Sequence, residues 1–533
     1  MASSRAPSAL PARRGRSGRP TESIASCSSS PAIASSIPTV PWAVSPAASN
    51  GSGPSSNWSA PECVDLSVFA VDNARSLKKE ETVYDIVILG GGPGGYVAAE
   101  RAAALGLKTA LIEKDAIGGT CLNRGCIPTK SLLHGAKTYR HALDSQAIGV
   151  SCTGVSYDLA AAMAWKAQTV QRLVQNVEFL MKKRGVELIR GSGRLVSSTT
   201  IGIDESGAAF EGRNVVIASG SEPARPPIPG AAGNPLVVTS DEILGIEKLP
   251  SSLVVIGGGV IGVELAAYFS ALGVKVSILE MLPEILPFMD ADLAAVYKRT
   301  LKGVAITTGA AVTGIDGGAV RYRKGEEAEE SSVSGDLVLL ATGRRPSLSG
   351  LGLEAVGVEF SPKGVKVDDS CRSGVPGVWA IGDATGRSLL AHSASAMGRA
   401  VAETIAGRAA SVPWKALPWV VYGDPEAAGV GMTEAEAKAA GFDAATSSLP
   451  ARANGRFLAE RGIAAHGVCK LVADRASGRV LGAHIVAPYA GEMIWGMQYA
   501  IAGDATVADL ERSVFPHPTV SELFHDALSA LEL

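Results

Sequence analysis

Two cysteines five residues apart, Cys121 and Cys126, are the side chains whose spacing most directly indicates chemistry. In a straight helix they would rise about 7.5 Å along the axis, whereas a disulfide needs Cα atoms within about 7 Å. Gly125 and Pro128 let the chain depart from regular helix, and Pro128 suits a first helical turn. Cys126 should then lie just before a helix N-terminus, where the dipole lowers the pKa of a thiol. The segment predicts a redox-active disulfide.

Metal binding and a pair of inert buried thiols are the alternative interpretations of these cysteines. A zinc site needs four ligands, and no second close pair of Cys or His residues accompanies this one. The other five cysteines are isolated: Cys27, Cys63, Cys152, Cys371 and Cys469. This is not the pattern of a secreted disulfide framework, so we expect a reducing compartment and no metal site.

A second candidate pair stands near the C-terminus, where His517 precedes Pro518 and Glu522 follows five residues later. A bend at the proline would bring the carboxylate to one imidazole nitrogen and make the other nitrogen a better base. The alternative is a histidine that caps or fills a helix start. Glu522 and His525 share helical i, i+3 spacing, but no further ligand joins them. His392 has no suitably spaced acid, and we expect it to be structural or to lie beside a cofactor.

The elements that must position these residues start at Val83, where VYDIVIL predicts a single buried strand that runs into Gly90-x-Gly92-x-x-Gly95. A helical stretch follows, and a second strand ends at Glu113. In such a βαβ unit the glycines let the chain approach a pyrophosphate at the helix N-terminus, and the acid accepts ribose hydrogen bonds. Because all these parts occur in order, a dinucleotide site is favoured over a glycine turn without a ligand.

The same pattern recurs as Gly257-x-Gly259-x-x-Gly262, followed by a helical stretch and a strand that ends at Glu280. Each feature is displaced by 167 residues from its counterpart, as Gly257 is from Gly90. Chance periodicity rarely keeps three positions in step, so the chain should contain two dinucleotide sites.

The neighbours of each acid indicate which nucleotide each unit holds. Cys121 comes eight residues after Glu113, so the first unit should hold the cofactor that reacts with sulfur. Met281, Leu282 and Pro283 follow Glu280 without an immediate cation. An acid with no nearby cation repels a 2′-phosphate, which favours NAD over NADP in the second unit.

Matching segments close the two units, VVIASGSEP at 215–223 and LVLLATGRRP at 337–346. Each is an apolar strand that ends in Ala-x-Gly, at Gly220 and Gly343, and each predicts a point where the chain crosses between domains. A third strand runs into Asp383, at the strand end where open α/β sheets bind ligands. An ordinary Gly-Asp turn is the alternative there.

Length and composition indicate several domains with large cores. The chain has 533 residues, 46% hydrophobic and 19% charged, and its 61 glycines exceed the roughly 7% average. Residues 1–60 hold five arginines and one acid, which leaves 44 basic and 51 acidic side chains after them. Nucleic acid as the main partner is disfavoured, because phosphate binding needs clustered cations. The sequence has no apolar run near the roughly 18 residues of a membrane span.

The first sixty residues contain 17 serines, eight prolines and Glu22 as the only acid. This composition favours a cleaved transit peptide over a disordered tail without a role. The prolines interrupt the amphipathic helix of a mitochondrial presequence, so the plastid stroma is the expected location and the mitochondrial matrix the second choice. Cleavage should fall between about Asn50 and Thr82.

Six motifs occur together and in order: GGGPGGY, GGTCLNRGCIPTK, GGGVIGVE, ATGRRP, AIGDATG and HPTVSE. With them, residues 83–533 resemble the flavin-dependent pyridine nucleotide-disulfide oxidoreductases and, among these, the dihydrolipoamide dehydrogenases. The arginine in CLNRGC and the leader resemble the plastid type. The implied fold class is α/β, with two Rossmann-like dinucleotide-binding domains and a C-terminal α+β dimer-interface domain. The implied boundaries are 1–75 for the transit peptide and linker, 83–222 for the first part of the FAD-binding domain, 223–348 for the NAD-binding domain, 349–412 for the return to the FAD-binding domain, and 413–533 for the interface domain.

The resemblance also implies roles for individual residues. Cys121 would exchange with the dihydrolipoyl group, and Cys126 would be the charge-transfer thiol against the flavin. His517 would be the base, oriented by Glu522 and supplied by the other subunit of a homodimer. FAD would be held by Gly90, Gly92, Gly95, Glu113 at the ribose, Lys130 near the isoalloxazine, Gly220 and Asp383 at the ribityl chain. NAD would be held by Gly257, Gly259, Gly262, Glu280 and Gly343.

The implied reaction is oxidation of protein-bound dihydrolipoamide with reduction of NAD. The partners would be the lipoyl domains of the acyltransferase in a 2-oxoacid dehydrogenase complex, with the plastid pyruvate dehydrogenase complex expected first. One alternative is an NADPH-dependent, glutathione-type disulfide reductase, which Glu280 disfavours. The other is a non-catalytic flavin-binding or nucleic-acid-binding scaffold, which the intact cysteine pair and His517-Glu522 disfavour. Which complex the chain serves stays open.

Overall fold

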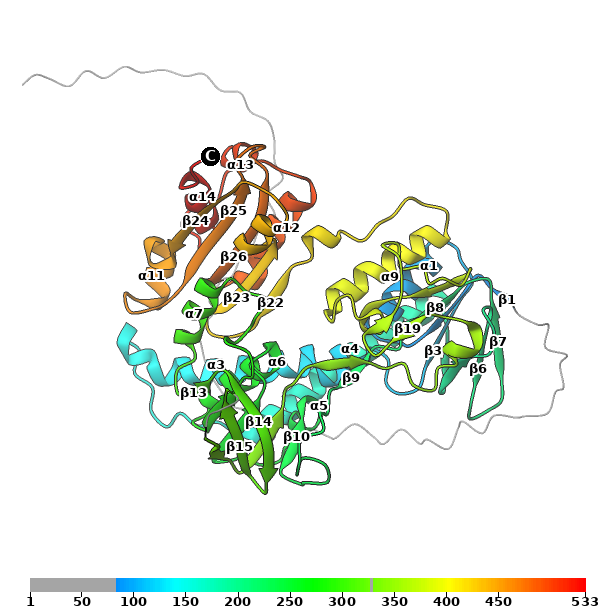
Figure 1. Cartoon of the computed structure of the whole chain (residues 1–533), viewed down its shortest axis with the longest axis horizontal. Coiled ribbons are helices and arrows are strands. Elements are labelled where there is room, and N and C mark those ends of the chain that lie inside the picture. The colour runs from blue at the N-terminus through cyan, green and yellow to red at the C-terminus, as the bar shows by residue number, and fades with distance from the viewer. Residues whose placement is uncertain (1–82, 326–328) are drawn as a thin grey trace, which may run out of the picture. The chain divides into compact units, whose positions relative to one another are not determined.

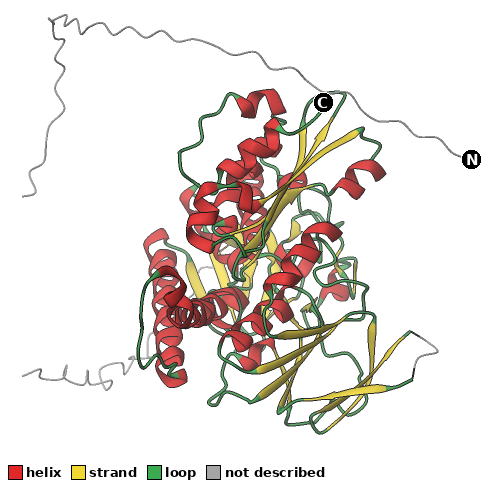
Figure 2. Ribbon diagram, turned by 90° about the vertical axis from the view of Figure 1, so that its left-hand side faces the viewer, coloured by secondary structure: helices red, strands yellow, loops and turns green. Residues whose placement is uncertain are grey.

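The computed structural model describes residues 83–325 and 329–533. The predicted transit peptide and linker at 1–75 lie outside these described residues. Figure 2 shows helices packed along the strands of several sheets, and three of these sheets have five strands each. Two of the three are parallel and the third is antiparallel.

The first glycine motif follows the central strand of a five-stranded sheet with the order β21-β8-β2-β3-β4. The strands are β2 (Ile86–Leu89), β3 (Thr109–Glu113), β4 (Glu187–Arg190), β8 (Val215–Ile217) and β21 (Val378–Ala380). All are parallel, and the four other than β4 are fully buried. This explains their continuous apolar sequences. Helix α1 (Pro93–Ala104) lies beside α9 (Ala391–Ile405), far away in sequence (Figure 1).

The prediction of one strand from Val83 to Leu89 is wrong, because the strand breaks at Asp85. The two residues before it form β1 (Val83–Tyr84), in a separate sheet with the order β1-β7-β6-β5. The other strands of that sheet are β5 (Gly193–Leu195), β6 (Thr200–Ile203) and β7 (Ala209–Gly212). The Asp85 carboxylate accepts from the Lys108 backbone N–H and from the Arg213 guanidinium, both at 2.9 Å. These partners are remote in sequence, so the apolar pattern could not reveal the break.

The second glycine motif lies on a matching parallel sheet with the order β10-β17-β11-β12-β13. The strands are β10 (Val237–Thr239), β11 (Ser252–Ile256), β12 (Lys275–Leu279), β13 (Val304–Thr307) and β17 (Leu337–Leu340). The helices are α5 (Ser240–Ile243), α6 (Val260–Ala271) and α7 (Ala291–Thr300). An antiparallel meander is formed by β14 (Ala310–Asp316), β15 (Ala319–Lys324) and β16 (Ser331–Ser334).

The cysteines lie on two consecutive helices, α2 (Gly119–Arg124) and α3 (Cys126–Asp144), which are separated by Gly125. The expected departure from regular helix is confirmed, and α3 starts at Cys126 itself. Helix α3 packs against α4 (Leu159–Arg184) and α6, and its Leu132 lies in the same hydrophobic cluster as Phe269 of α6. The cysteine-bearing helix is therefore fixed to both dinucleotide units.

The two crossing segments meet as an antiparallel pair, β9 (Ser221–Pro223) with β18 (Arg344–Pro346). Beyond α9 the chain forms the antiparallel sheet β22-β23-β26-β25-β24. Its strands are β22 (Trp419–Val421), β23 (Glu426–Gly431), β24 (Ala444–Pro450), β25 (Val468–Asp474) and β26 (Val480–Ala487). Its helices are α10 (Glu434–Ala439), α11 (Gly455–Arg461), α12 (Ala490–Ala502), α13 (Val507–Glu511) and α14 (Glu522–Ser529). The C-terminal α+β arrangement agrees with the expected fold class.

Candidate active site

In both motifs only glycine fits, because the first turn of the helix contacts the glycine that directly follows the strand. A Cβ on Gly95 would lie 1.8 Å from the carbonyl oxygen of Gly90, and one on Gly262 would lie 2.1 Å from that of Gly257. Gly90 and Gly257 have φ of +109° and +111°, which L side chains rarely adopt. The first N–H groups of α1 and α6 have no partner within their helices, so each turn can hold an anion.

Glu113 and Glu280 make equivalent contacts in the two units. One carboxylate oxygen of Glu113 accepts from the Gly91 N–H at 2.7 Å, and one of Glu280 accepts from the Gly258 N–H at 2.5 Å. The second oxygen accepts from the N–H two residues further on, that of Asp115 or Leu282. Each buried acid therefore fixes its glycine turn, a contact that the spacing of the glycines does not predict.

Cys121 and Cys126 are free thiols that line one cavity and are hydrogen-bonded to each other. The hydrogen bond from Cys121, helped by the charge of Lys130, lowers the pKa of Cys126 to about 7 against the opposing effect of burial. The pKa of Cys121 is raised, because it donates that hydrogen bond and is itself buried. One thiolate of the pair, that of Cys126, therefore forms near neutral pH.

Lys130 lies one helical turn after Cys126 and is held by two side chains of other elements. Its ammonium forms an ion pair with the buried Glu264 of α6 at 2.8 Å and lies 4.5 Å from the ring centroid of Tyr422. Glu264 also accepts from the Tyr422 backbone N–H at 2.9 Å. Neither Glu264 nor Tyr422 was predicted to belong to the site from the sequence. The signal for Glu264 was present in the motif GGGVIGVE, two positions after Gly262.

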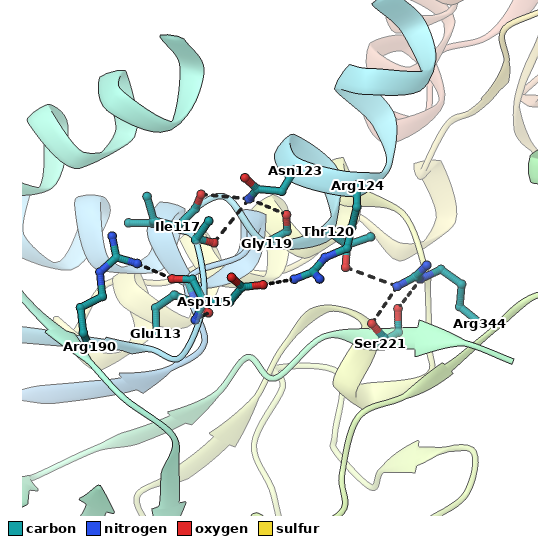
Figure 3. A network of polar contacts seen from close by, with 12 residues as sticks. Glu113, Asp115, Ile117, Gly119, Thr120, Asn123, Arg124, Arg190, Ser221 and Arg344 are labelled. Atoms are coloured by element: carbon teal, nitrogen blue, oxygen red, sulfur yellow. Dashed lines mark hydrogen bonds and ion pairs between the residues drawn. The ribbon is translucent and has the colours of Figure 1, made fainter. Parts of the chain in front are cut away.

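Asp383 lies in a short 3₁₀ helix (Gly382–Thr385) that follows β21, and it accepts from the Ser221 hydroxyl at 2.6 Å. Burial raises its pKa, and the hydrogen bond from Ser221 and the charge of Arg344 oppose that shift. Arg344 donates to Ser221 and, more weakly at 3.3 Å, to Thr120, the residue before Cys121 (Figure 3). These contacts link the crossing segments to helix α2.

The approach to α2 from Glu113 is fixed by charge and by amide hydrogen bonds. Arg124 pairs with Asp115 at 2.5 Å, and the Asn123 amide donates to the carbonyls of Ile117 and Gly119 (Figure 3). These contacts hold the segment between Glu113 and Cys121 against helix α2.

A single cavity of about 1730 Å³ connects both glycine motifs with the cysteines, Lys130 and Asp383. Cβ atoms on Gly220 and Gly343, at φ of +73° and +100°, would meet no atom of the described residues within 4 Å, their own chain neighbours aside. The Ser219 hydroxyl, on the cavity wall, is buried without a hydrogen-bond partner among the described residues. These features fit FAD on the side of the first unit and NAD on the side of the second.

The cations that line the described part of this cavity are Lys114, Arg124, Lys130 and Arg344. The segment after Glu280 contributes Met281, Leu282, Pro287 and Phe288 to the wall, and none of these is charged. The lining therefore agrees with the expectation that a 2′-phosphate has no partner beside Glu280.

His517 and Glu522 form the hydrogen bond that their spacing predicted. The imidazole Nδ1 lies 2.9 Å from Glu522 Oε1, and the other carboxylate oxygen accepts from the Thr519 backbone N–H. The hydrogen bond from Thr519, and after it the one with His517, lowers the pKa of Glu522. The His517 side chain is 81% exposed and is not among the residues that line this chain's cavity. The structure therefore does not bring His517 and the cysteines together within one subunit.

The remaining sequence expectations concern His392, metals and membranes. His392 lines the cavity, with its Nε2 2.6 Å from the Pro418 carbonyl oxygen. Within residues 83–325 and 329–533, no group of His, Cys, Asp or Glu is placed to hold a metal ion. In the same ranges, no helix is both long and apolar enough to cross a membrane.

Comparisons with known proteins agree with this geometry. Residues 84–398 match the family described as pyridine nucleotide-disulphide oxidoreductase, and residues 417–528 match its dimerisation domain. The chain is 38% identical over 452 residues to a dihydrolipoyl dehydrogenase of Geobacillus stearothermophilus, a match that covers 83% of this chain and 95% of the relative. It is 39% identical over 459 residues to a mitochondrial dihydrolipoyl dehydrogenase of Pisum sativum, with 84% and 91% covered.

A solved structure shares the arrangement as well. The flavoprotein disulfide reductase RclA from Escherichia coli superposes with a TM-score of 0.74 at 29% identity, over 84% of this chain and all of that one. The matched dimerisation domain indicates a homodimer. These matches confirm the resemblance carried by the motifs, although they do not show a plastid type. The chain belongs to the pyridine nucleotide-disulphide oxidoreductase family and is an FAD- and NAD-dependent oxidoreductase that acts on sulfur groups.

Proposed function

We propose that this chain oxidises protein-bound dihydrolipoamide to lipoamide and reduces NAD. The observation that carries the proposal is the single cavity that reaches Cys121, Cys126 and both glycine motifs. FAD bound there would transfer two electrons between sulfur and the nicotinamide. We assign residues 83–222 and 349–412 to FAD, 223–348 to NAD and 413–533 to the dimer interface.

The reaction starts from the oxidised enzyme, with a Cys121–Cys126 disulfide. A base takes the proton of one dihydrolipoyl thiol, because a thiolate attacks sulfur and a thiol does not. The new bond to the Cys121 sulfur breaks the disulfide, and Cys126 leaves with the electron pair. The second lipoyl thiol then passes its proton to the departing Cys121 as its sulfur attacks the first, which closes the lipoyl disulfide and releases Cys121 as a thiol. The lipoyl group has lost two electrons and the protein disulfide has gained them.

Cys126 is suited to be the leaving group in this step. A thiol of lower pKa leaves faster. In the dithiol, the hydrogen bond from Cys121 and then the charge of Lys130 lower the pKa of Cys126. While Cys121 is bonded to the lipoyl sulfur it has no proton to donate, so the charge of Lys130 is what favours the departing thiolate. Glu264 and Tyr422 hold that ammonium in place. We propose that Lys130 stabilises the Cys126 thiolate beside the flavin.

The proposed base is the partner subunit's His517, oriented by Glu522 of the same chain. Two observations support this assignment: the imidazole is exposed, and its Nε2 is left for a proton after Nδ1 has bound the carboxylate. Each subunit of the homodimer would then complete the cavity of the other.

The proposed partners are the lipoyl domains of the acyltransferase in a 2-oxoacid dehydrogenase complex. Among these complexes we propose the plastid pyruvate dehydrogenase complex. The plant relative at 39% identity is mitochondrial by name. The location of this chain in the cell therefore decides which 2-oxoacid dehydrogenase complex it serves. A fluorescent fusion of residues 1–80 should enter plastids, whereas accumulation in mitochondria would contradict the plastid assignment.

The experiment that tests the reaction uses the purified FAD-loaded dimer. It should reduce NAD with dihydrolipoamide and leave glutathione disulfide unchanged in the presence of NADPH. Rapid NADPH-dependent reduction of glutathione disulfide would contradict the proposal.

A further inference from the structure

A buried lysine connects the C-terminal sheet to the nucleotide-binding unit that contains Glu280. Lys470 is on β25, and its side chain is only 7% exposed. Its ammonium lies 3.2 Å from carboxylate oxygens of Asp290 and Asp292, at the start of α7, and 3.0 Å from one of Glu434 on α10. The function proposed above uses none of these groups.

Asp290 ends the segment 281–290, which starts directly after Glu280. This segment packs on the second glycine turn: the Leu286 N–H donates to the Gly258 carbonyl at 3.0 Å, and Ile285 would contact a Cβ at Gly258 at 2.7 Å. Met281, Leu282, Pro287 and Phe288 of the segment line the cavity. The position of the segment therefore shapes the NAD side of the site.

The other end of the segment rests on the C-terminal sheet. The Phe288 ring meets the Trp419 ring edge to face at 5.0 Å, and Trp419 stacks on His484. Asp290 is itself buried. A buried ion pair adds little net stability, because desolvation offsets the attraction, but it can specify one arrangement of the parts that it joins.

We propose that Lys470 is a positioning residue for NAD. By holding Asp290 it fixes the segment 281–290 against the glycine turn, so that Glu280 and the apolar cavity wall are in place before the nucleotide binds. This inference rests on the assignment of NAD to the second unit. It predicts that loss of the Lys470 charge weakens NAD binding and leaves the sulfur and flavin sides intact.

The test is calorimetric titration of NAD into the oxidised, FAD-loaded dimer, which involves no turnover. In Lys470→Met the Kd for NAD should rise about three- to thirtyfold, the range of coupling through a network of this kind. FAD content and the KM for dihydrolipoamide should match the unchanged protein, and Lys470→Arg should recover most of the affinity. Lys438→Met is the matched control, because Lys438 pairs with the same Glu434 at 2.6 Å but is 61% exposed.

Unchanged NAD affinity in a folded, FAD-loaded Lys470→Met dimer would overturn the inference. If that variant does not load FAD, the titration is repeated with Asp290→Asn. In this variant Lys470 keeps its ion pairs with Asp292 and Glu434. The same loss of affinity is expected there, and an unchanged Kd would overturn the inference equally. Failure of the unchanged protein to bind NAD would instead refute the assignment of NAD to this unit.

Discussion

The two dinucleotide units share a nucleotide-binding turn and differ in the segment that comes after its acid. In each unit a buried glutamate accepts the N–H of the middle glycine and so fixes the turn. After Glu113 the chain enters α2 within six residues and presents Cys121. After Glu280 it runs through the segment 281–290, which Lys470 anchors on another sheet. One unit therefore leads into the redox centre, and the other leads into an apolar wall.

This difference shows how a repeated fold acquires two roles. Both copies have the nucleotide-binding turn, and in both a glutamate 22 residues further along the chain fixes it. The segments after the two acids differ, and each is held by contacts remote in sequence. Substitutions in each unit and at the histidine dyad should separate these roles. The expected loss of activity or affinity is largest for Cys121 and smallest for Lys130.

Cys121→Ser should affect only the unit that carries sulfur chemistry. Turnover should fall at least about a thousandfold, because the attacked sulfur is lost. FAD should remain bound, since the cysteine does not hold the cofactor, and NAD affinity should be unchanged. Steady-state rates and the flavin absorbance spectrum measure these effects, with the exposed Cys152→Ser as the control. Loss of FAD from Cys121→Ser would mean that this cysteine is structural.

His517→Gln should separate the two half-reactions, because His517 belongs to neither unit. Reduction of the enzyme by dihydrolipoamide should slow by about a hundredfold or more, the usual contribution of a positioned base. Reduction by NADH should stay near the normal rate. Glu522→Gln should have a smaller effect in the same direction, because it orients the imidazole. Equal slowing of both half-reactions in stopped-flow experiments would argue against this role.

Gly95→Ala and Gly262→Ala form a matched pair across the two units. The added methyl would lie 1.8 Å and 2.1 Å from a carbonyl oxygen, respectively, and such overpacking costs about 1–3 kcal/mol. The first substitution should weaken FAD binding and the second NAD binding, each by about ten- to a hundredfold. Gly455→Ala is the control, because its Cβ would meet no atom within 4 Å in the part of the chain that the structure describes, its neighbours in sequence aside. If either variant lost both nucleotides, the two units would not bind FAD and NAD independently, and this prediction would be wrong.

Lys130→Met should change the titration of the redox centre. The hydrogen bond from Cys121 and, after it, the charge of Lys130 lower the pKa of Cys126 to about 7, so the thiolate predominates above pH 7 and falls to about a tenth at pH 6. Removing the cation should move the alkylation midpoint of the reduced enzyme upward by about one pH unit. Iodoacetamide labelling against pH, read by mass spectrometry, measures this shift. A midpoint that stays near 7 would show that the hydrogen bond from Cys121 is sufficient.

Local sequence was enough to predict much of the site. The break between Cys121 and Cys126 followed from helix geometry and from Gly125, and the His517–Glu522 hydrogen bond followed from a five-residue spacing around Pro518. The break at Asp85 and the roles of Glu264 and Tyr422 were not predicted, because their partners lie from 23 to 158 residues away.

The sequence by itself determined the two nucleotide turns, the cysteine pair and the histidine dyad, because each depends on backbone geometry within a few residues. Only the tertiary structure decided that both turns and the cysteines share one cavity, that Glu264 holds Lys130, and that Lys470 anchors the segment after Glu280. Lys130 and Glu264 come from two different helices, and Lys470 and Asp290 come from a strand of the C-terminal sheet and the start of α7. Pairing at such distances depends on the packing of whole elements, and no local pattern encodes it.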